Sequence, residues 1–245
     1  MVSTAVIPRN WQIFLRVDAN NDEQFTVLYA MLVQSVQNEG KELVVNDGEA
    51  VLCLPRQVDE SSLTPCGHEE ADLRIMLHVT HTAMHDHSRI QVRTVDTDVV
   101  VLAMRLAQVL PYVDKPWITC GMDKNYRYIP AHEIAASLGP QKARALPVFH
   151  ALIGCDTVSA FVEHGKKSAS ATFNSFPEVT GSLVILTTTP VGIQDDTIHC
   201  IERFLALLYG HTSPYSKVKE ARKKLFAKRN SAERISPSYY ALELQ

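Results

Sequence analysis

The clearest pattern of apolar and polar positions runs through residues 68–101, where a helical period gives way to a short apolar strand. Apolar residues recur every four positions between Glu69 and His85, which predicts an amphipathic helix with one buried stripe. The β-branched run Ile90 to Val95 predicts a buried strand, and Thr97 to Leu110 predicts the next helix. The helical stripe consists of Ala71, Ile75, Val79 and Ala83.

Before this stretch, the pattern predicts two helices and a β-hairpin. Asp47-Gly48 lies between two short apolar runs and is a strong signal for a tight hairpin turn. A polar segment with two prolines follows the second run and predicts a loop. The helices are expected at 10–17 and 22–38, and the strands at 42–46 and 50–54.

After residue 110, two short strands precede a succession of helices. Strands that alternate with helices indicate an α/β layer with a partly parallel sheet, and ligands bind at the carboxyl ends of the strands in such sheets. We predict strands at 117–120 and 126–129, and helices at 130–138, 141–153, 157–161, 167–173, 178–186, 195–209 and 216–229.

Four parts along the chain follow from these elements. N-terminal helices and the hairpin occupy residues 1–67, and an α/β core with helices on both faces of its sheet occupies residues 68–155. A helical C-terminal region covers residues 156–230. Residues 231–245 are predicted to form a disordered tail.

Composition and charge exclude several classes of protein. With 245 residues, 46% of them hydrophobic, the chain is long enough to bury a sizeable core. A net charge of −3 gives no overall attraction to nucleic acid, so such binding needs a local patch. The 5 scattered cysteines lack a C-x-x-C pair, which favours reduced thiols and an intracellular location, nuclear or cytoplasmic. No apolar run approaches the roughly 20 residues of a membrane span, so no membrane partner is expected.

Carboxylates stand at three points of this pattern. Two such charges about 4 Å apart repel by roughly 4 kcal/mol at an effective dielectric of about 20. A fold that gathers them therefore needs a divalent cation between them or protonation of some of them. Mg²⁺ and Mn²⁺ suit a site built from oxygen ligands. The acids are Glu69, Glu70 and Asp72 at a helix start, Asp96 and Asp98 after a strand, and Asp156 in HALIGCDTVSAF.

Each acid also has an ordinary structural explanation. Asp96 or Asp98 fits the N-cap of the helix that starts near residue 97, and Asp156 fits a similar cap. Glu69 and Glu70 suit the electrostatics of a first helical turn. Spacing alone therefore does not establish a metal site.

Three other features admit both a binding role and a structural one. His78, His81 and His85 share a helix face that could offer imidazoles to a metal, although a solvated face explains them as well. The run 217–229 holds seven basic residues and one acid, which fits phosphate contact or a solvated helix face. Asp47 is the one tempting acid before the core, and its hairpin turn explains it.

Three blocks together resemble the PIN-like 5′-nuclease superfamily of flap endonucleases. They are EEAD at 69–72, VDTDVVVL at 95–102 and HALIGCDTVSAF with HGKK at 150–167. That superfamily has an acidic pair that opens a helix, a D-x-D after a strand, and a G-C-D that leads into a helix-hairpin-helix. The likeness covers residues 69–175, whereas nearly the whole chain is similar to uncharacterised, transposon-associated animal proteins with the same blocks.

The resemblance implies a PIN-like, Rossmann-like α/β fold whose acids hold Mg²⁺ or Mn²⁺ over a scissile phosphate. Glu70 and Asp72 match the helix-opening pair, and Glu69 replaces either one with a shift of one residue. Asp96 and Asp98 match the D-x-D pair and are the implied catalytic residues. The complete set of implied metal ligands is Glu69, Glu70, Asp72, Asp96, Asp98 and Asp156.

The helix-hairpin-helix of that superfamily meets the phosphate backbone of nucleic acid. Gly165, Lys166 and Lys167 fall at the corresponding place, which implies nucleic-acid contact, with DNA favoured over RNA. The match is loose, because the family's G-x-G hairpin appears as Glu163-His164-Gly165.

The start of the chain departs from the family. The family's core begins with two strands that each end in an aspartate, followed by a basic helical arch. Nothing before Glu69 fits both strands, so we expect the chain to be the C-terminal portion of a longer ancestor or a truncated gene product.

Three hypotheses of function remain. The first is a nuclease that hydrolyses phosphodiesters of structured DNA or RNA with a carboxylate-bound divalent cation. The second is a catalytically inactive, transposon-derived module that binds nucleic acid or protein. The third is a small-molecule phosphatase on a similar sheet, which predicts no helix-hairpin-helix after Asp156.

Overall fold

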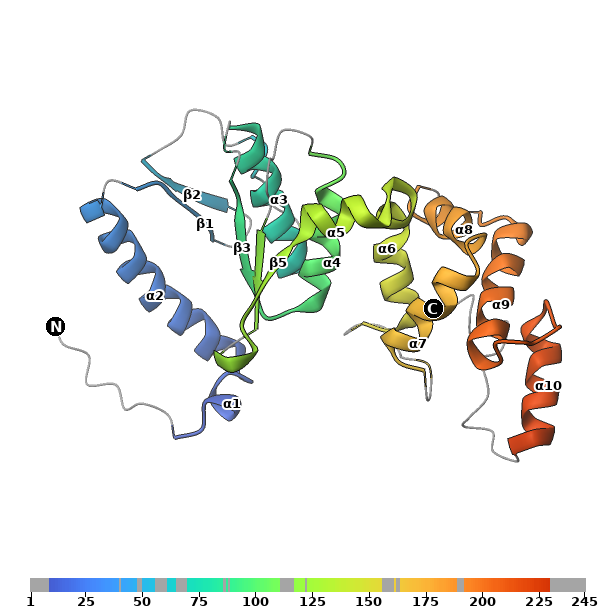
Figure 1. Cartoon of the computed structure of the whole chain (residues 1–245). Coiled ribbons are helices and arrows are strands. Elements are labelled where there is room, and N and C mark those ends of the chain that lie inside the picture. The colour runs from blue at the N-terminus through green and yellow to red at the C-terminus, as the bar shows by residue number, and fades with distance from the viewer. Residues whose placement is uncertain are drawn as a thin grey trace. The chain divides into compact units, whose positions relative to one another are not determined.

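A computed structural model shows two compact units along the chain, Met1–Glu69 and Glu70–Gln245 (Figure 1). The residues that the structure describes are 9–39, 41–47, 50–55, 61–64, 70–85, 87, 89–110, 117–121, 123–155, 161, 164–188 and 192–229.

The first unit contains the helices and the hairpin that its sequence predicts. The side chain of Asn10 accepts a hydrogen bond from the backbone N–H of Ile13 at 3.1 Å and so caps the first helix. The hairpin is antiparallel and pairs Asp47 with Ala50, as a two-residue connection at 48–49 requires. The elements are α1 (Trp11–Phe14), α2 (Asp18–Glu39), β1 (Leu43–Asp47) and β2 (Ala50–Leu54).

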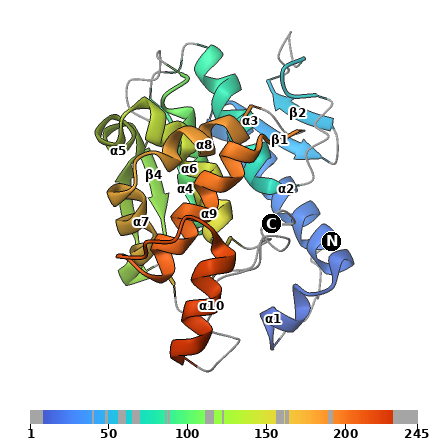
Figure 2. The same cartoon turned by 90° about the vertical axis from the view of Figure 1, so that its right-hand side faces the viewer.

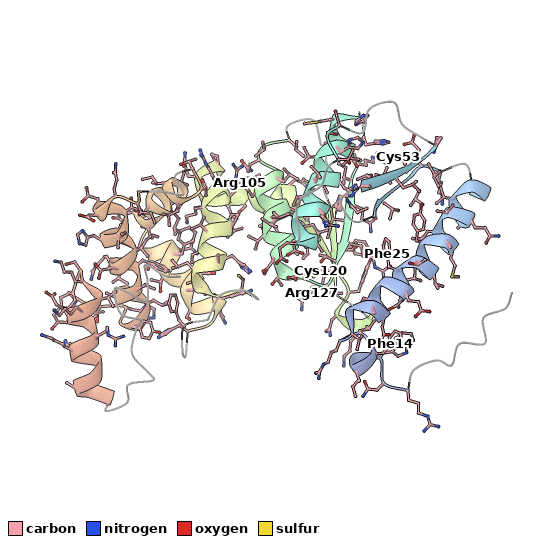
Figure 3. All side chains as sticks on the ribbon, turned by 180° about the vertical axis from the view of Figure 1, so that it is seen from behind. Phe14, Phe25, Cys53, Arg105, Cys120 and Arg127 are labelled. Carbon is pink, nitrogen blue, oxygen red and sulfur yellow. The ribbon has the colours of Figure 1, made fainter. Side chains whose placement is uncertain are left out.

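The second unit is built on a small mixed sheet in the order β3-β4-β5. The strands β3 (Gln91–Thr94) and β4 (Trp117–Cys120) are parallel, whereas β5 (Arg127–Pro130) is antiparallel to β4. Cys120 pairs with Arg127 across the β4–β5 connection, and both residues are labelled in Figure 3. The α/β class is confirmed, and the sheet is parallel in one of its two strand pairs.

Helices α3 (Ala71–Met84) and α4 (Thr97–Leu106) cover one face of this sheet. Val92 of β3 packs with Val79 of α3 and Val99 of α4, which form the centre of this core. On the opposite face, the described side chains of Gln91, Arg93 and Tyr128 are exposed, whereas Thr119 is fully buried. Helices on both faces of the sheet stay a prediction.

The C-terminal helices form a second core within the same unit. Phe149 stacks on Phe173 with ring centroids 4.6 Å apart and meets Phe204 edge to face. Figure 2 shows this helical side of the unit. The helices are α5 (Ala131–Leu138), α6 (Pro140–Ile153), α7 (Lys166–Ser175), α8 (Val179–Leu186), α9 (Asp195–Tyr209) and α10 (Val218–Arg229).

Helix α6 joins the two cores, because it packs against both α4 and α8. The predicted boundary between residues 155 and 156 therefore falls inside one compact unit. The predicted helix at 157–161 lies largely outside the described residues, and Phe161 itself belongs to no helix. The predicted tail at 231–245 also lies outside them. Among the described residues, no helix has the length and apolar character that a membrane crossing requires.

Candidate metal centre

Asp72 converges with Asp96 and Asp98, which lie more than twenty residues further along the sequence, where α3 and α4 begin. Asp72 lies in the first turn of α3, Asp96 caps α4, and Asp98 lies in the first turn of α4. One carboxylate oxygen from each residue lies within 4.8 Å of the others. The two helix starts are brought together because α3 packs along α4 on the same face of the sheet.

The capping role of Asp96 is real and leaves part of its carboxylate available. Its backbone is extended (φ −94°, ψ 135°), and its Oδ1 accepts a hydrogen bond from the backbone N–H of Asp98 at 2.8 Å. Its own N–H donates to Oγ1 of Thr94 at 2.9 Å. The cap uses one oxygen, so the second remains as a ligand atom. Capping and metal binding are therefore compatible at this residue.

An open pocket of about 510 Å³ lies over these carboxylates. Its walls are apolar on the side of α4 and α6, and a largely apolar wall strengthens electrostatic interactions inside the pocket relative to bulk water. The described residues that line it belong to the second unit. They are Glu70, Ala71, Asp72, Leu73, Asp96, Asp98, Val101, Leu102, Pro147, His150, Ala151 and Cys155.

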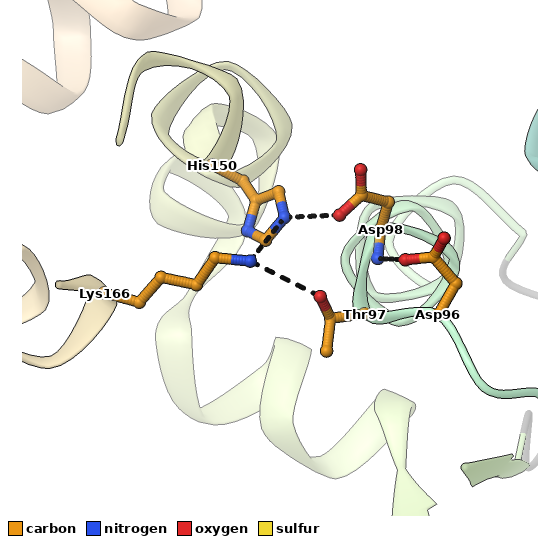
Figure 4. Close-up of polar contacts among 5 residues, drawn as sticks. All are labelled: Asp96, Thr97, Asp98, His150 and Lys166. Atoms are coloured by element: carbon orange, nitrogen blue, oxygen red, sulfur yellow. Dashed lines mark hydrogen bonds and ion pairs between the residues drawn. The ribbon is translucent and has the colours of Figure 1, made fainter. Parts of the chain in front are cut away.

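His150 and Lys166 bring nitrogen atoms to the edge of the cluster (Figure 4). The Nε2 atom of His150 lies 2.7 Å from Oδ1 of Asp98, and these side chains are only 12% and 22% exposed. The Nζ atom of Lys166 lies 3.2 Å from the same Nε2 and 3.4 Å from Oγ1 of Thr97. Since Nε2 carries at most one hydrogen, it cannot donate to Asp98 and accept from Lys166 at once. The arrangement therefore admits two alternative bonding patterns.

Glu70 lines the pocket but does not belong to the close cluster. It occupies the N-cap position of α3, its side chain makes no capping hydrogen bond, and it is exposed. The predicted ligands Glu69 and Asp156 lie outside the described residues. Cys155, which directly precedes Asp156, lines the pocket wall. Of the six implied ligands, the structure brings together Asp72, Asp96 and Asp98.

The three residues implied in nucleic-acid contact have different places. Gly165 is the N-cap of α7 with φ −84°, and Lys166 opens that helix. Lys166 reaches the acidic cluster through His150 and Thr97, whereas Lys167 is exposed. Lys166 is thus a residue of the pocket edge, which the sequence placed in a separate backbone-binding hairpin.

His150 has no role in the interpretation of the sequence, although it opens the third acidic block. A signal was present, because His150 lies six residues before Asp156 in a block already assigned to the site. What the sequence lacked was the pairing of α4 with α6 that brings His150 to Asp98.

The histidines of α3 form no comparable ligand cluster within the described residues. His81 is buried, and its carbonyl oxygen lies 2.9 Å from Nδ1 of His85. Burial lowers the pKa of His78, and the neighbouring His81 lowers it further. His78 and His81 are therefore part of the packing of α3, whereas His85 is exposed at the end of the helix.

The basic run at 217–229 forms most of α10 and remains a candidate for phosphate contact. Lys219, Lys223 and Lys224 are exposed, while Val218 and Ala221 are buried against the second core. Lys224 lies over the ring of Tyr215 at 5.6 Å from its centroid. A helix that is buried on one face and charged on the other is what a solvated surface helix requires.

Comparison of the chain with protein-family models, with curated proteins and with solved structures finds no match.

Proposed function

We propose that this protein is a divalent-cation-dependent phosphodiester hydrolase that acts on DNA. The observation that carries the proposal is the convergence of Asp72, Asp96 and Asp98 within 4.8 Å. Three carboxylates at that separation repel one another unless a cation or protons neutralise them. All of their donor atoms are oxygens, which suits Mg²⁺ or Mn²⁺ rather than a metal that prefers sulfur.

A divalent cation held there supplies Lewis-acid activation of water and of the phosphodiester. The residues of this chain position that chemistry. Asp98 is held by His150, so its carboxylate has a fixed orientation toward Asp72 and Asp96. Lys166 places a positive charge at the pocket edge, where it would stabilise negative charge on a phosphate.

The choice of a phosphodiester as the substrate rests on the resemblance of the three acidic blocks to PIN-like nucleases. A PIN-like core is part of this proposal. Its support is the order of acidic helix start, strand, D-x-D and helix along α3, β3 and α4. The mixed sheet of β3, β4 and β5 is small for such a core.

A second candidate function is an inactive module that binds nucleic acid or protein. One observation favours it: within the described residues, the clustered carboxylates come from α3 and the start of α4 alone. Three ligands can hold one cation, whereas a two-metal mechanism requires a larger set. Such a module keeps the pocket but does not cleave phosphodiesters.

Cleavage of a branched DNA in the presence of Mn²⁺ tests the proposal. We expect Asp98→Asn to reduce the rate by at least about a hundredfold, because it removes a charge at the cation. Asp196→Asn is the matched control, since Asp196 also lies in the first turn of a helix and is exposed far from the cluster in sequence. Equal rates for the wild type and Asp98→Asn would exclude the enzyme. Absence of cleavage in both, with DNA binding retained, would favour the inactive module.

A further inference from the structure

A second cluster of charge lies along the same pair of helices, at the ends opposite to the acidic site. Asp98 at the start of α4 contacts His150 near the end of α6, and α4 packs along α6. The charge of Arg105, in the last turn of α4, interacts with that of Arg144, in the first half of α6. The two helices are therefore antiparallel. Val101, Leu102 and Pro147 lie between the two clusters and line the pocket. Arg105 is labelled in Figure 3.

Neither arginine is neutralised within the described part of the chain. No hydrogen bond or ion pair joins either guanidinium to a described residue, and Nε of Arg144 is buried without a partner. Both side chains are half-buried. A buried donor without an acceptor and two adjacent like charges both destabilise a fold. The described residues therefore leave the charges of the two arginines and a buried N–H donor of Arg144 available for an external anion.

The charges also affect one another. Burial lowers the pKa of Arg105, and the charge of Arg144 lowers it further. An anion between the two groups opposes both effects, because it offsets the repulsion and accepts hydrogen bonds from the N–H donors.

The electrostatics of helix ends explains only one of the two arginines. Arg105 lies in the last turn of α4, where a cation interacts favourably with the helix dipole. Arg144 lies in the first half of α6, which begins at Pro140, so the dipole gives no reason for a cation there. The helix dipole therefore explains Arg105 and leaves Arg144 unexplained.

We propose that Arg105 and Arg144 together bind a backbone phosphate of the nucleic-acid strand whose scissile phosphate lies at the aspartate cluster. This inference rests on the proposed function. Guanidinium groups suit it because each can donate two parallel hydrogen bonds to phosphate oxygens. The proposal defines the substrate as a strand long enough to reach both clusters.

The length of α4 sets that reach. Asp98 and Arg105 are seven residues apart, which corresponds to about 10 Å along a helix. Successive phosphates of one B-form strand advance by about 3.4 Å, so the second phosphate lies roughly three nucleotides from the first. A dinucleotide cannot occupy both sites, whereas an octanucleotide can.

Binding of a fluorescent 12-nucleotide DNA strand in EDTA tests the anchor without cleavage. We expect Arg105→Gln and Arg144→Gln each to weaken DNA binding about tenfold. Each should also reduce the slope of log affinity against log salt concentration by the contribution of about one phosphate contact. Arg93→Gln removes the same charge from an exposed position on β3 and is the matched control. Arg105→Lys keeps the charge, loses the two-donor geometry and should weaken binding about threefold.

Thermal unfolding of the free protein separates a ligand site from a structural role. The two glutamine variants should melt at higher temperature than the wild type, because they relieve repulsion and desolvation. Lower melting temperatures would show that a group of the protein itself neutralises the pair, and they would overturn the proposal. Affinity that is unchanged, that falls equally in Arg93→Gln, or that is absent in the wild type would overturn it as well.

A third measurement distinguishes failure of this inference from failure of the proposed function. In Mn²⁺, the wild type should cleave an octanucleotide faster than a trinucleotide, and Arg105→Gln should lose that preference. If no cleavage occurs but the arginine variants still weaken DNA binding, the phosphate site at the two arginines is supported and the hydrolase activity is rejected. If Asp98→Asn abolishes cleavage while the arginine variants keep the preference for the octanucleotide, the hydrolase activity is supported and the phosphate site at the two arginines is rejected.

Discussion

Asp96 serves the backbone and the acidic cluster with one carboxylate. Its Oδ1 accepts the N–H of Asp98, and the same side chain contributes an oxygen to the cluster with Asp72. The two roles differ in what they need. A cap needs a short polar acceptor, whereas a cation needs the negative charge. A substitution that keeps one property and removes the other therefore separates them.

Asp96→Ser should keep the free energy of unfolding near that of the wild type, because serine is a good N-cap. Asp96→Ala should lower it by about 1 kcal/mol, through loss of the cap. Both variants should weaken Mn²⁺ binding by at least about tenfold, since both remove the charge. Chemical denaturation and isothermal titration with Mn²⁺ measure the two effects. Normal Mn²⁺ affinity in Asp96→Ser would show that Asp96 is only a cap.

Single residues also show what the sequence can predict of the site. Asp72, Asp96 and Asp98 were assigned from their positions at helix starts and from the resemblance, and the structure brings them together. His150 could not be assigned, because its contact with Asp98 joins residues 52 positions apart. Contacts between helices depend on the packing of α4 and α6, and one sequence contains no direct signal for that pairing.

At the scale of elements, the periodicity of α3 was a reliable guide. Three members of the predicted stripe pack against the sheet, with Val79 buried and Ile75 and Ala83 beside it, whereas Ala71 is exposed at the pocket. The same helix carries His78 next to this stripe, half-buried and near His81. Protonation of His78 is therefore coupled to the packing of α3 within the second unit.

Protonation of His78 should destabilise the second unit in mild acid. Burial, and then His81, lower the pKa of His78 below its ordinary value of 6.5. The unfolded chain therefore binds this proton at higher pH than the folded one. The destabilisation is absent above about pH 6.5, grows as the pH falls below that value, and levels off below the folded pKa. Denaturation between about pH 7.5 and about pH 5 should show this loss.

Replacement of the imidazole identifies its source. His78→Gln should flatten the dependence of the unfolding free energy on pH, because glutamine does not titrate. His211→Gln is the control, since His211 is exposed. If the slopes of the wild type and His78→Gln coincide, burial of His78 contributes nothing to the acid sensitivity.

Element order was easier to predict than sheet geometry. The strand at 117–120 and the helix at 195–209 begin and end where the apolar pattern places them. The pattern did not reveal that β5 is antiparallel to β4, because strand direction follows from the connection, here the short η1 turn Asp123–Asn125. Helices on both faces stay a prediction, because on the face opposite to α3 and α4 Tyr128 is 66% exposed whereas Thr119 is fully buried.

At the scale of the whole molecule, the acidic cluster and the arginine pair belong to one compact unit. The described residues that line the pocket lie between Glu70 and Cys155, and both arginines lie on α4 and α6 of the same unit. Two hydrophobic cores, one under the sheet and one among the C-terminal helices, are joined through α6. The described residues on which the proposed chemistry depends therefore all belong to the second unit.

A fragment of residues 70–245 should consequently fold and keep the metal-binding and DNA-binding properties of the full chain. Its cores contain large apolar side chains that are fully buried, including Phe204, Leu183 and Ile118, and the elements that carry them all belong to this unit. We expect one cooperative unfolding transition, with Mn²⁺ and 12-nucleotide DNA affinities within about threefold of the full chain. Asp98→Asn in the fragment should lose Mn²⁺ binding, and Arg105→Gln should lose DNA affinity, as in the full chain. A fragment that folds but binds neither would show that residues 1–69 contribute to the site, and the proposed function would then have to include them.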